Sequence, residues 1–297
     1  MTGALTDVPG IQVGHWTGEG TGVTVILPAS RAVAAGELRG GAPATRELAL
    51  LDPSRTVESI DAVVFTGGSA FGLAAADGVV TWLAERGRGF PTRGGPVPIV
   101  PTAAIYDLVA SGGTHPGAAD GAAAIDAAAR GNPLTTGRVG AGRGATVGKW
   151  RGADYAVAGG LGSASTTVDD ATVGALAVVN ALGDVRGPTG AVLAGSTAPA
   201  DTPAFPDPEP FDAAEPNTTL LVVATDARCT KAECFLLAQS AQHGVAWAVH
   251  PSHTRHDGDL AIALATGLVT AHLDRLRVAA TEVAAAAVRD AVGPGDD

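Results

Sequence analysis

Lysine and aromatic residues are scarce in this chain. Only two of its 19 basic residues are lysines, Lys149 and Lys231, and aromatic residues make up 4% of the sequence. Because large rings are few, the core must be built from Ala, Val, Leu and Ile, and a hydrophobic fraction of 46% is enough for a sizeable one. The 297 residues could form one large domain or two ordinary ones.

Other features that the sequence lacks disfavour whole classes of protein. A formal net charge of −11 argues against a nucleic-acid surface, which needs clustered basic residues. The first ten residues contain neither the basic nor the apolar region of a signal peptide, and no apolar run approaches the ~18 residues of a membrane span. Cys229 and Cys234 are five residues apart, which is not the C-x-x-C spacing of metal or redox sites. We therefore expect buried free thiols in a cytoplasmic protein.

Apolar periodicity predicts a mixture of strands and helices. Strands are expected over 21–28, 153–168 and 220–224, and residues 61–87 are expected to form a strand, a glycine turn and a helix that ends at Gly87. Residues 173–185 fit either a strand or a helix. This mixture is typical of an α/β or α+β fold.

Two helices are expected in the last quarter of the chain. Thr230 and Glu233 form a capping box before an apolar run, which predicts a helix that reaches about His243 and stops at Gly244. The apolar stripe over 269–292 predicts a final helix, which ends before a Gly-Pro pair.

Residues 196–216 differ from the rest in composition. Six prolines and five acidic residues without apolar periodicity predict an exposed, poorly ordered loop, either a domain linker or a tail that leads to a cleavage point. The loop ends at Asn217-Thr218-Thr219, three polar residues at the head of the buried run 220–224. They mark either the end of a loop or a place where the chain cuts itself.

Two glycine-rich segments resemble catalytic motifs but do not match them. Residues 139–150 fail the Walker pattern and fit the dinucleotide pattern only loosely, so no nucleotide site is expected there. In TGGSAFG, residues 66–72, a nucleophile elbow around Ser69 would require glycine where Phe71 stands. Ser69 is therefore expected to be a helix N-cap.

Three histidines and two aspartates gather in the segment HPSHTRHDGD. His250, His253 and His256 recur at a spacing of three and precede Asp257, so a metal-dependent hydrolase is one alternative. Pro251 opposes a regular helical His-x-x-His face, and the sequence contains no H-E-x-x-H pattern. Solvated loop histidines are the simpler interpretation.

Lys149 stands inside the glycine-rich segment of a chain that otherwise uses arginine. An ammonium group can shift its pKa and act at close range, whereas a guanidinium stays charged. Glycine lets the backbone approach a ligand closely. These observations favour a chemical role for Lys149 over a surface position.

Six segments occur in an order that identifies a family: VPGIQVGHWT, RGGAPATREL, FTGGSAFGLAAADGV, VGAGRGATVGK, PNTTL and HTRHDGDLAIALATG. With them the whole chain resembles the DmpA-like N-terminal-nucleophile hydrolases, peptidase family S58, which include L-aminopeptidase/D-esterases, β-aminopeptidases and nylon-oligomer endohydrolases. The resemblance implies an α+β fold, a four-layer αββα sandwich, in one catalytic domain of residues 1–297. It implies no metal and no other cofactor.

The resemblance also implies self-cleavage between Asn217 and Thr218. The products would be an α subunit, 1–217, and a β subunit, 218–297, which assemble into a homo-oligomer of heterodimers. Thr218 would become the N-terminal nucleophile, with its own α-amine, of ordinary pKa about 7.7–8.0, as the base. The substrate would be a small peptide or amide.

Five further residues match the family one at a time. The resemblance makes Tyr106 the active-site tyrosine, Lys149 the lysine of the nylon-hydrolase branch and Asn180 an oxyanion ligand. Asp257 and Asp259 match the acidic pair that orients the nucleophile. The family's aminopeptidases mostly have Gly-Ser at the junction and a Ser and a Glu in the later loop. Asn-Thr and Asp-x-Asp place this chain nearer the nylon-oligomer branch, and leave open whether a substrate needs a free N-terminus.

Two alternatives to an amide hydrolase remain at this point. One is the metal-dependent hydrolase, and the other is a non-catalytic protein on the same fold. Metal analysis tests the first, and an intact chain without cleavage at Thr218 would favour the second.

Overall fold

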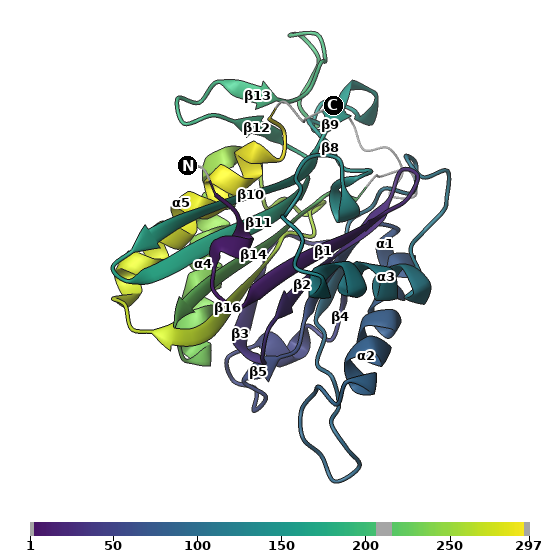
Figure 1. The fold of residues 1–297 in the computed structure, drawn as a ribbon. Helices are drawn as coiled ribbons and strands as arrows, with labels where there is room; N and C mark the ends of the chain where they lie inside the picture. The colour runs from purple at the N-terminus through teal and green to yellow at the C-terminus, as the bar shows by residue number, and fades with distance from the viewer. Residues whose placement is uncertain (1–2, 206–215, 294–297) are drawn as a thin grey trace.

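Two large β-sheets dominate the computed structural model, which describes residues 3–205 and 216–293 (Figure 1). The five-stranded sheet has the order β1 (Ile11–Thr17), β2 (Gly22–Pro28), β6 (Val63–Thr66), β7 (Thr102–Ala104) and β4 (Ala44–Arg46). The six-stranded sheet has the order β10 (Gly160–Val168), β11 (Ala171–Asn180), β14 (Thr218–Ala227), β16 (Leu260–Val269), β3 (Ala32–Leu38) and β5 (Ser59–Ile60). Only β6–β7 and β14–β16 pair in parallel among the pairs described within these two sheets.

Short strands and helices complete the fold. A three-stranded sheet contains β13 (Val192–Ala194), β12 (Asp184–Arg186) and β15 (Val249–His250), and a two-stranded one contains β8 (Thr146–Val147) and β9 (Val157–Ala158). The α-helices are α1 (Ser69–Gly72), α2 (Ala75–Glu85), α3 (Ala118–Ala129), α4 (Lys231–Ala248) and α5 (Leu273–Asp290). The 3-10 helices are η1 (Leu5–Asp7), η2 (Ala49–Leu51), η3 (Gly140–Gly142) and η4 (Ala153–Tyr155).

Strand β14 contributes to two cores because its side chains alternate between the faces of the sheet. Leu221 and Val223 pack in the same apolar cluster as α4 and α5. Leu220 and Val222 belong to a second cluster, which includes Phe65 of the other large sheet. The two large sheets therefore pack face to face, with β14 buried between the helices and the opposite sheet.

The outer face of the five-stranded sheet is covered in the same way. Val23 of β2 and Val64 of β6 pack with Val79 and Leu83 of α2 and with Ile125 of α3. Figure 1 shows α2 and α3 on this outer face, and α4 and α5 on the far side of the six-stranded sheet. Mixed sheets with helices on their outer faces make this an α+β fold, as the resemblance implied.

Most strand predictions agree with the structure. The segments 21–28 and 220–224 lie in β2 and β14, the second half of 153–168 forms β10, and 173–185 begins as strand β11. Residues 61–87 form β6, a glycine turn and helices α1 and α2, and Gly87, at φ 65°, follows the end of α2. Of the expected loop 196–216, residues 206–215 lie outside the described residues.

Two helix boundaries were predicted wrongly. The capping box at Thr230 and Glu233 begins α4, but the helix continues through Gly244 to Ala248. Gly244 is instead where α4 approaches α5, because a Cβ there would lie 2.4 Å from the carbonyl oxygen of Thr281. Helix α5 begins only at Leu273, because the residues up to Val269 still belong to β16.

The prediction that Ser69 caps a helix is also wrong. Gly68, at φ 78°, is the N-cap of α1, and Ser69 is its first residue with φ 53°. The N–H of Gly68 donates to the Asp107 carboxylate at 2.6 Å, and the N–H of Ser69 donates to the carbonyl of Ile105 at 2.9 Å. The main-chain N–H groups of Gly68 and Ser69 therefore already have hydrogen-bond acceptors in a neighbouring segment, and a serine side-chain cap is not needed.

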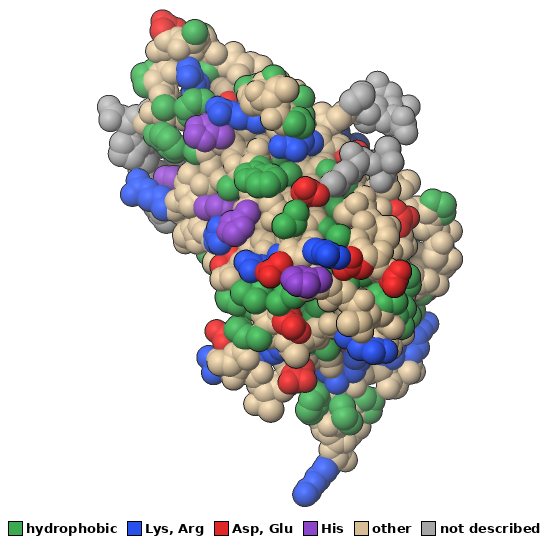
Figure 2. All heavy atoms as spheres, turned by 90° about the vertical axis from the view of Figure 1, so that its left-hand side faces the viewer, with side chains coloured by type: hydrophobic (Ala, Val, Ile, Leu, Met, Phe, Trp, Pro, Cys, Tyr) green, Lys and Arg blue, Asp and Glu red, His purple; other side chains and the backbone are tan. Residues whose placement is uncertain are grey.

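Surface charge is mixed on the face that Figure 2 shows. Basic and acidic side chains are interspersed there with apolar ones and with histidines. This face is therefore not the continuous basic surface that a nucleic acid would need. In the ranges 3–205 and 216–293, no helix combines the length and the apolar character needed to cross a membrane.

We predict that Gly244→Ala destabilises the protein by about 1–3 kcal/mol. Alanine inside a helix ordinarily stabilises a protein by roughly 0.5–1 kcal/mol relative to glycine. Here we expect a destabilisation instead, because the added Cβ would clash with α5. Urea denaturation measures the change. The control is Gly94→Ala, where a Cβ would meet its nearest atom at 3.8 Å, and where we expect a change within about 0.5 kcal/mol. A Gly244→Ala protein as stable as wild type would contradict the close approach.

Candidate active site

The parallel pairing of β14 and β16 places two polar segments side by side. Leu220 pairs with Leu260 in this ladder, and Asn217 and Asp257 form a parallel bridge just before it. The N–H of Asn217 donates to the carbonyl of His256 at 3.0 Å, and the N–H of Gly258 donates to the carbonyl of Asn217 at 2.7 Å. The Asn-Thr-Thr and Asp-Gly-Asp segments are thereby fixed in register.

Thr218 is the first residue of β14 and is 3% exposed. Its Oγ1 donates to the carbonyl oxygen of Asn217 at 2.5 Å, so the hydroxyl lies against the peptide group that precedes it. On the other side of β14, Thr218 pairs with Asn180, the last residue of β11. The main chain of Thr218 therefore lies between β11 and β16, and the residue is buried.

Lys149 and Asn180 are joined directly. Lys149 is 6% exposed, and its Nζ donates to Asn180 Oδ1 at 3.0 Å and to the Asn180 carbonyl at 3.3 Å. Asn180 Nδ2 donates to the carbonyl of Tyr106 at 3.2 Å, and its Oδ1 also accepts the N–H of Thr146 at 3.0 Å. Tyr106 thus reaches this group through its main chain, and its side chain is half-buried.

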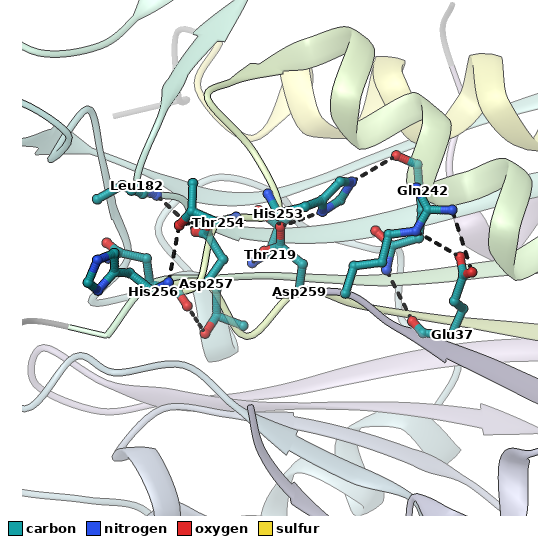
Figure 3. A network of polar contacts seen from close by, with 12 residues as sticks. Glu37, Leu182, Thr219, Gln242, His253, Thr254, His256, Asp257 and Asp259 are labelled. Atoms are coloured by element: carbon teal, nitrogen blue, oxygen red, sulfur yellow. Dashed lines mark hydrogen bonds and ion pairs between the residues drawn. The ribbon is translucent and has the colours of Figure 1, made fainter. Parts of the chain in front are cut away.

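Asp257 is 1% exposed and is held by its own loop (Figure 3). Its Oδ2 accepts the N–H of Thr254 at 2.8 Å and the hydroxyl of Thr254 at 2.6 Å, and its Oδ1 accepts the N–H of Leu182 at 3.5 Å. Burial, followed by the charge of Asp259, raises the pKa of Asp257, although these hydrogen bonds oppose the rise. A raised pKa suits a group that takes up a proton during a reaction.

Asp259 has a different environment, because its carboxylate is paired with the ring of His253. Its Oδ1 accepts the N–H of Thr219 at 2.6 Å, and its Oδ2 accepts the N–H of His253 at 3.1 Å. Oδ2 also lies 2.8 Å from Nδ1 of the same histidine (Figure 3). Burial lowers the pKa of His253, but the hydrogen bond and charge of Asp259 outweigh burial and leave that pKa raised. The pair favours an imidazolium beside a carboxylate.

The three histidines do not converge. His250 is exposed, His253 is bound to Asp259, and Nε2 of His256 lies 3.1 Å from Nε of Arg255. Within the described residues, no three His, Cys, Asp or Glu side chains are grouped so that they could hold a metal ion. The metal-dependent alternative therefore has no ligand set there.

Asp107, next to Tyr106, is a buried carboxylate that lies under the 66–72 turn. It is 3% exposed and accepts the N–H of Gly68 at 2.6 Å. Burial raises the pKa of Asp107 to about 6, against the opposing effects of the Gly68 N–H and the Thr21 hydroxyl. This carboxyl group connects the turn to the loop that carries Tyr106.

The comparison with protein families gives one match over nearly the whole chain. Residues 3–295 match the model described as peptidase family S58. The chain belongs to peptidase family S58. It is therefore a hydrolase of amide bonds with an N-terminal-nucleophile fold, as the sequence motifs predicted.

Relatives within family S58 carry two kinds of name. A protein of Mycobacterium leprae named an uncharacterized aminopeptidase is 45% identical, and the match covers 90% of this chain and 80% of that protein. A 6-aminohexanoate-oligomer endohydrolase of Agromyces sp. is 31% identical, and the match covers 88% of this chain and 74% of that enzyme. The chain is thus similar to both branches.

Two solved aminopeptidase structures share the fold. A Burkholderia sp. β-aminopeptidase superimposes with a TM-score of 0.75 and 25% identity, over 97% of this chain and 85% of its own. The L-aminopeptidase D-Ala-esterase/amidase of Ochrobactrum anthropi, whose title describes a variant of the Ntn hydrolase fold, gives a TM-score of 0.72 at 21% identity with the same coverage. The second likeness concerns the fold alone.

The structure brings the expected site residues of this S58 member together from five segments. Lys149 and Asn180 contact each other, Asn180 pairs with Thr218, Asp259 binds the N–H next to Thr218, and Tyr106 joins through its carbonyl. Sequence reasoning considered His253 only as a metal ligand or a solvated loop residue, and it missed Thr254, Gly258 and Asp107. His253, Thr254 and Gly258 lie in the HTRHDGD motif, which could have pointed to their roles, whereas nothing in the sequence placed Asp107 under a distant turn.

We predict that Asp107 makes stability fall as pH rises from about 4 to 6. In this window the folded state keeps a proton on Asp107 that the unfolded state has released, so unfolding becomes easier. A shift from 3.8 to about 6 corresponds to at most about 3 kcal/mol. Asp107→Asn does not ionise but still offers an oxygen to Gly68. Urea denaturation from about pH 4 to 6 should therefore show the free energy of unfolding of Asp107→Asn rising relative to that of wild type. A difference in unfolding free energy that does not change with pH would contradict the account.

Proposed function

We propose that this S58 hydrolase cuts its own chain between Asn217 and Thr218, and that Thr218 then attacks amide substrates. The observation that carries this proposal is the position of Thr218 Oγ1, 2.5 Å from the Asn217 carbonyl oxygen in a buried group with Lys149 and two carboxylates. The proposal includes one catalytic domain of residues 1–297 that becomes fragments 1–217 and 218–297. It also includes an αββα sandwich and assembly of the heterodimers into a homo-oligomer.

Self-cleavage would begin with attack of Thr218 Oγ on the Asn217 carbonyl carbon. The hydroxyl gives up its proton, the new C–O bond forms, and the carbonyl π electrons move to oxygen. The C–N bond then breaks, the amine of Thr218 takes a proton, and an ester remains. Water hydrolyses the ester, which leaves the Asn217 carboxylate and a free hydroxyl and amine on Thr218.

Turnover would repeat this chemistry on a substrate amide. The free α-amine of Thr218 takes the proton of its own hydroxyl, because an amine of pKa about 7.7–8.0 is a suitable base near neutral pH. Asp259, which binds the N–H of Thr219, fixes the main chain beside the nucleophile. Lys149 and Asn180 supply charge and a neutral amide where negative charge develops on the substrate oxygen.

The substrate class follows from the relatives and from the junction residues. Relatives are named aminopeptidases and 6-aminohexanoate-oligomer endohydrolase, so we propose short peptides or amide oligomers as substrates. Asn-Thr at the junction and Asp-x-Asp in the later loop favour a site like that of the oligomer hydrolases.

We expect purified protein to give two fragments, the second with Thr218 as its first residue. Thr218→Ala should leave an intact, folded and inactive precursor, and Thr218→Ser should retain some cleavage because it keeps a hydroxyl. A denaturing gel with N-terminal sequencing measures this. An intact wild-type chain would favour the non-catalytic alternative, and amide hydrolysis by Thr218→Ala would place the nucleophile elsewhere.

We expect Lys149→Met and Lys149→Arg to slow self-cleavage and turnover to a similar degree. Loss of one preorganised donor typically costs about 10²–10³ in rate, and the larger, planar guanidinium would not fit the buried position of an ammonium. The measurements are cleavage rates on gels and initial rates on a short amide. Wild-type rates in both variants would mean that Lys149 is not used, and full rescue by arginine would mean that only charge is required.

The second lysine provides a matched control for these variants. Lys231 is also buried, and its Nζ donates to the carbonyls of Leu50, Arg55 and Val57 at 2.7, 2.9 and 2.7 Å. Lys231→Met should lower the thermal stability, because three buried carbonyls lose a donor, while the cleavage rate of the folded protein stays near wild type.

A further inference from the structure

We propose that the main-chain N–H of Gly258 stabilises the oxyanion of the self-cleavage step. This inference rests on the proposed cleavage between Asn217 and Thr218. It assigns a task to the main chain of the glycine between the two aspartates.

The first observation is the partner of the carbonyl that would be attacked. The carbonyl oxygen of Asn217 accepts the N–H of Gly258 at 2.7 Å, on the oxygen that becomes negative when Thr218 attacks. Donors at 2.7–3.1 Å from such an oxygen are what an oxyanion hole requires. Asn180, the expected oxyanion ligand, instead donates its amide to the carbonyl of Tyr106 in the continuous chain. Gly258 is thus already aligned before any rearrangement.

The second observation is that the residues on both sides of Gly258 are anchored. Asp257 accepts two hydrogen bonds from Thr254, and Asp259 accepts the N–H of Thr219 at 2.6 Å and is paired with His253 (Figure 3). The main-chain donor between them is therefore held in place from both ends. A fixed donor stabilises developing charge without the cost of reorientation during the reaction.

The third observation explains why this position is glycine. A Cβ on residue 258 would lie 2.8 Å from the carbonyl oxygen of Ala42, and 3.0 Å from both Cα of Pro43 and Oγ1 of Thr218. Two of these atoms belong to the main chain of another loop, which cannot move as freely as a side chain. Any larger residue would therefore push the N–H away from the carbonyl and crowd the nucleophile.

In the proposed step the N–H of Gly258 exchanges no proton. The Oγ–C bond forms, the C=O π pair becomes the third lone pair on the Asn217 oxygen, and the hydrogen bond from Gly258 shortens onto that charge. When the C–N bond breaks, the pair returns to the C=O bond of the ester, and the amine of Thr218 is protonated.

Replacement of Gly258 by glycolic acid tests this role, because it exchanges the N–H for an ester oxygen and adds no side chain. The chain is made by cell-free translation, and the rate of self-cleavage is followed on denaturing gels. We expect cleavage to slow about 10²–10³-fold. The control is the same exchange at Gly190, an exposed turn residue whose N–H donates to the carbonyl of Gly187 at 2.9 Å, and it should cleave at the wild-type rate.

Gly258→Ala is the second variant, and it tests the role of the Gly258 N–H if the ester variant does not fold. It keeps the N–H but displaces it, so we expect cleavage at least 10-fold slower in protein with a wild-type circular dichroism spectrum. A wild-type cleavage rate in either folded variant would overturn the inference while leaving the proposed function intact. A wild-type chain that never cleaves would overturn the proposed function, and this inference with it.

Discussion

The parallel ladder between β14 and β16 is the constraint on which the rest of the site depends. It starts at Leu220 and Leu260, and the residues just before it, Asn217 and Asp257, are already bridged. Because side chains in a strand alternate, a shift of one residue would exchange the two apolar faces of β14, so that Leu and Val side chains would enter cores packed around different residues. The burial of alternate Leu and Val residues thus fixes where the Thr218 hydroxyl lies relative to the Asp-Gly-Asp loop.

Burial of charge around Thr218 is compensated locally. Asp259 is paired with His253, Asp257 accepts hydrogen bonds from Thr254, and Lys149 donates to Asn180. Such contacts offset the desolvation of ionised groups, which would otherwise be costly in a core. The two carboxylates therefore differ in environment, although one residue separates them.

Much of the fold could be predicted from periodicity, and the family from motifs. β14 was evident from its apolar run, and α4 from its capping box. The end of α4 could not be predicted, because Gly244 reads as a stop until the contact with Thr281 is known. Similarly, the scarcity of lysine suggested a chemical role for Lys149, yet equally rare Lys231 binds three loop carbonyls. Long-range contacts, which no local pattern encodes, separate these cases.

The central claim is that the Thr218 hydroxyl is the group that receives the acyl part of an amide substrate. Its most direct test is to mix the protein with an activated ester, quench with acid so that the acyl group cannot migrate to nitrogen, and map the added mass by mass spectrometry. The account predicts an acyl group on Thr218, at the first position of the C-terminal fragment. An acyl group on another residue, or the same labelling in Thr218→Ala, would contradict it.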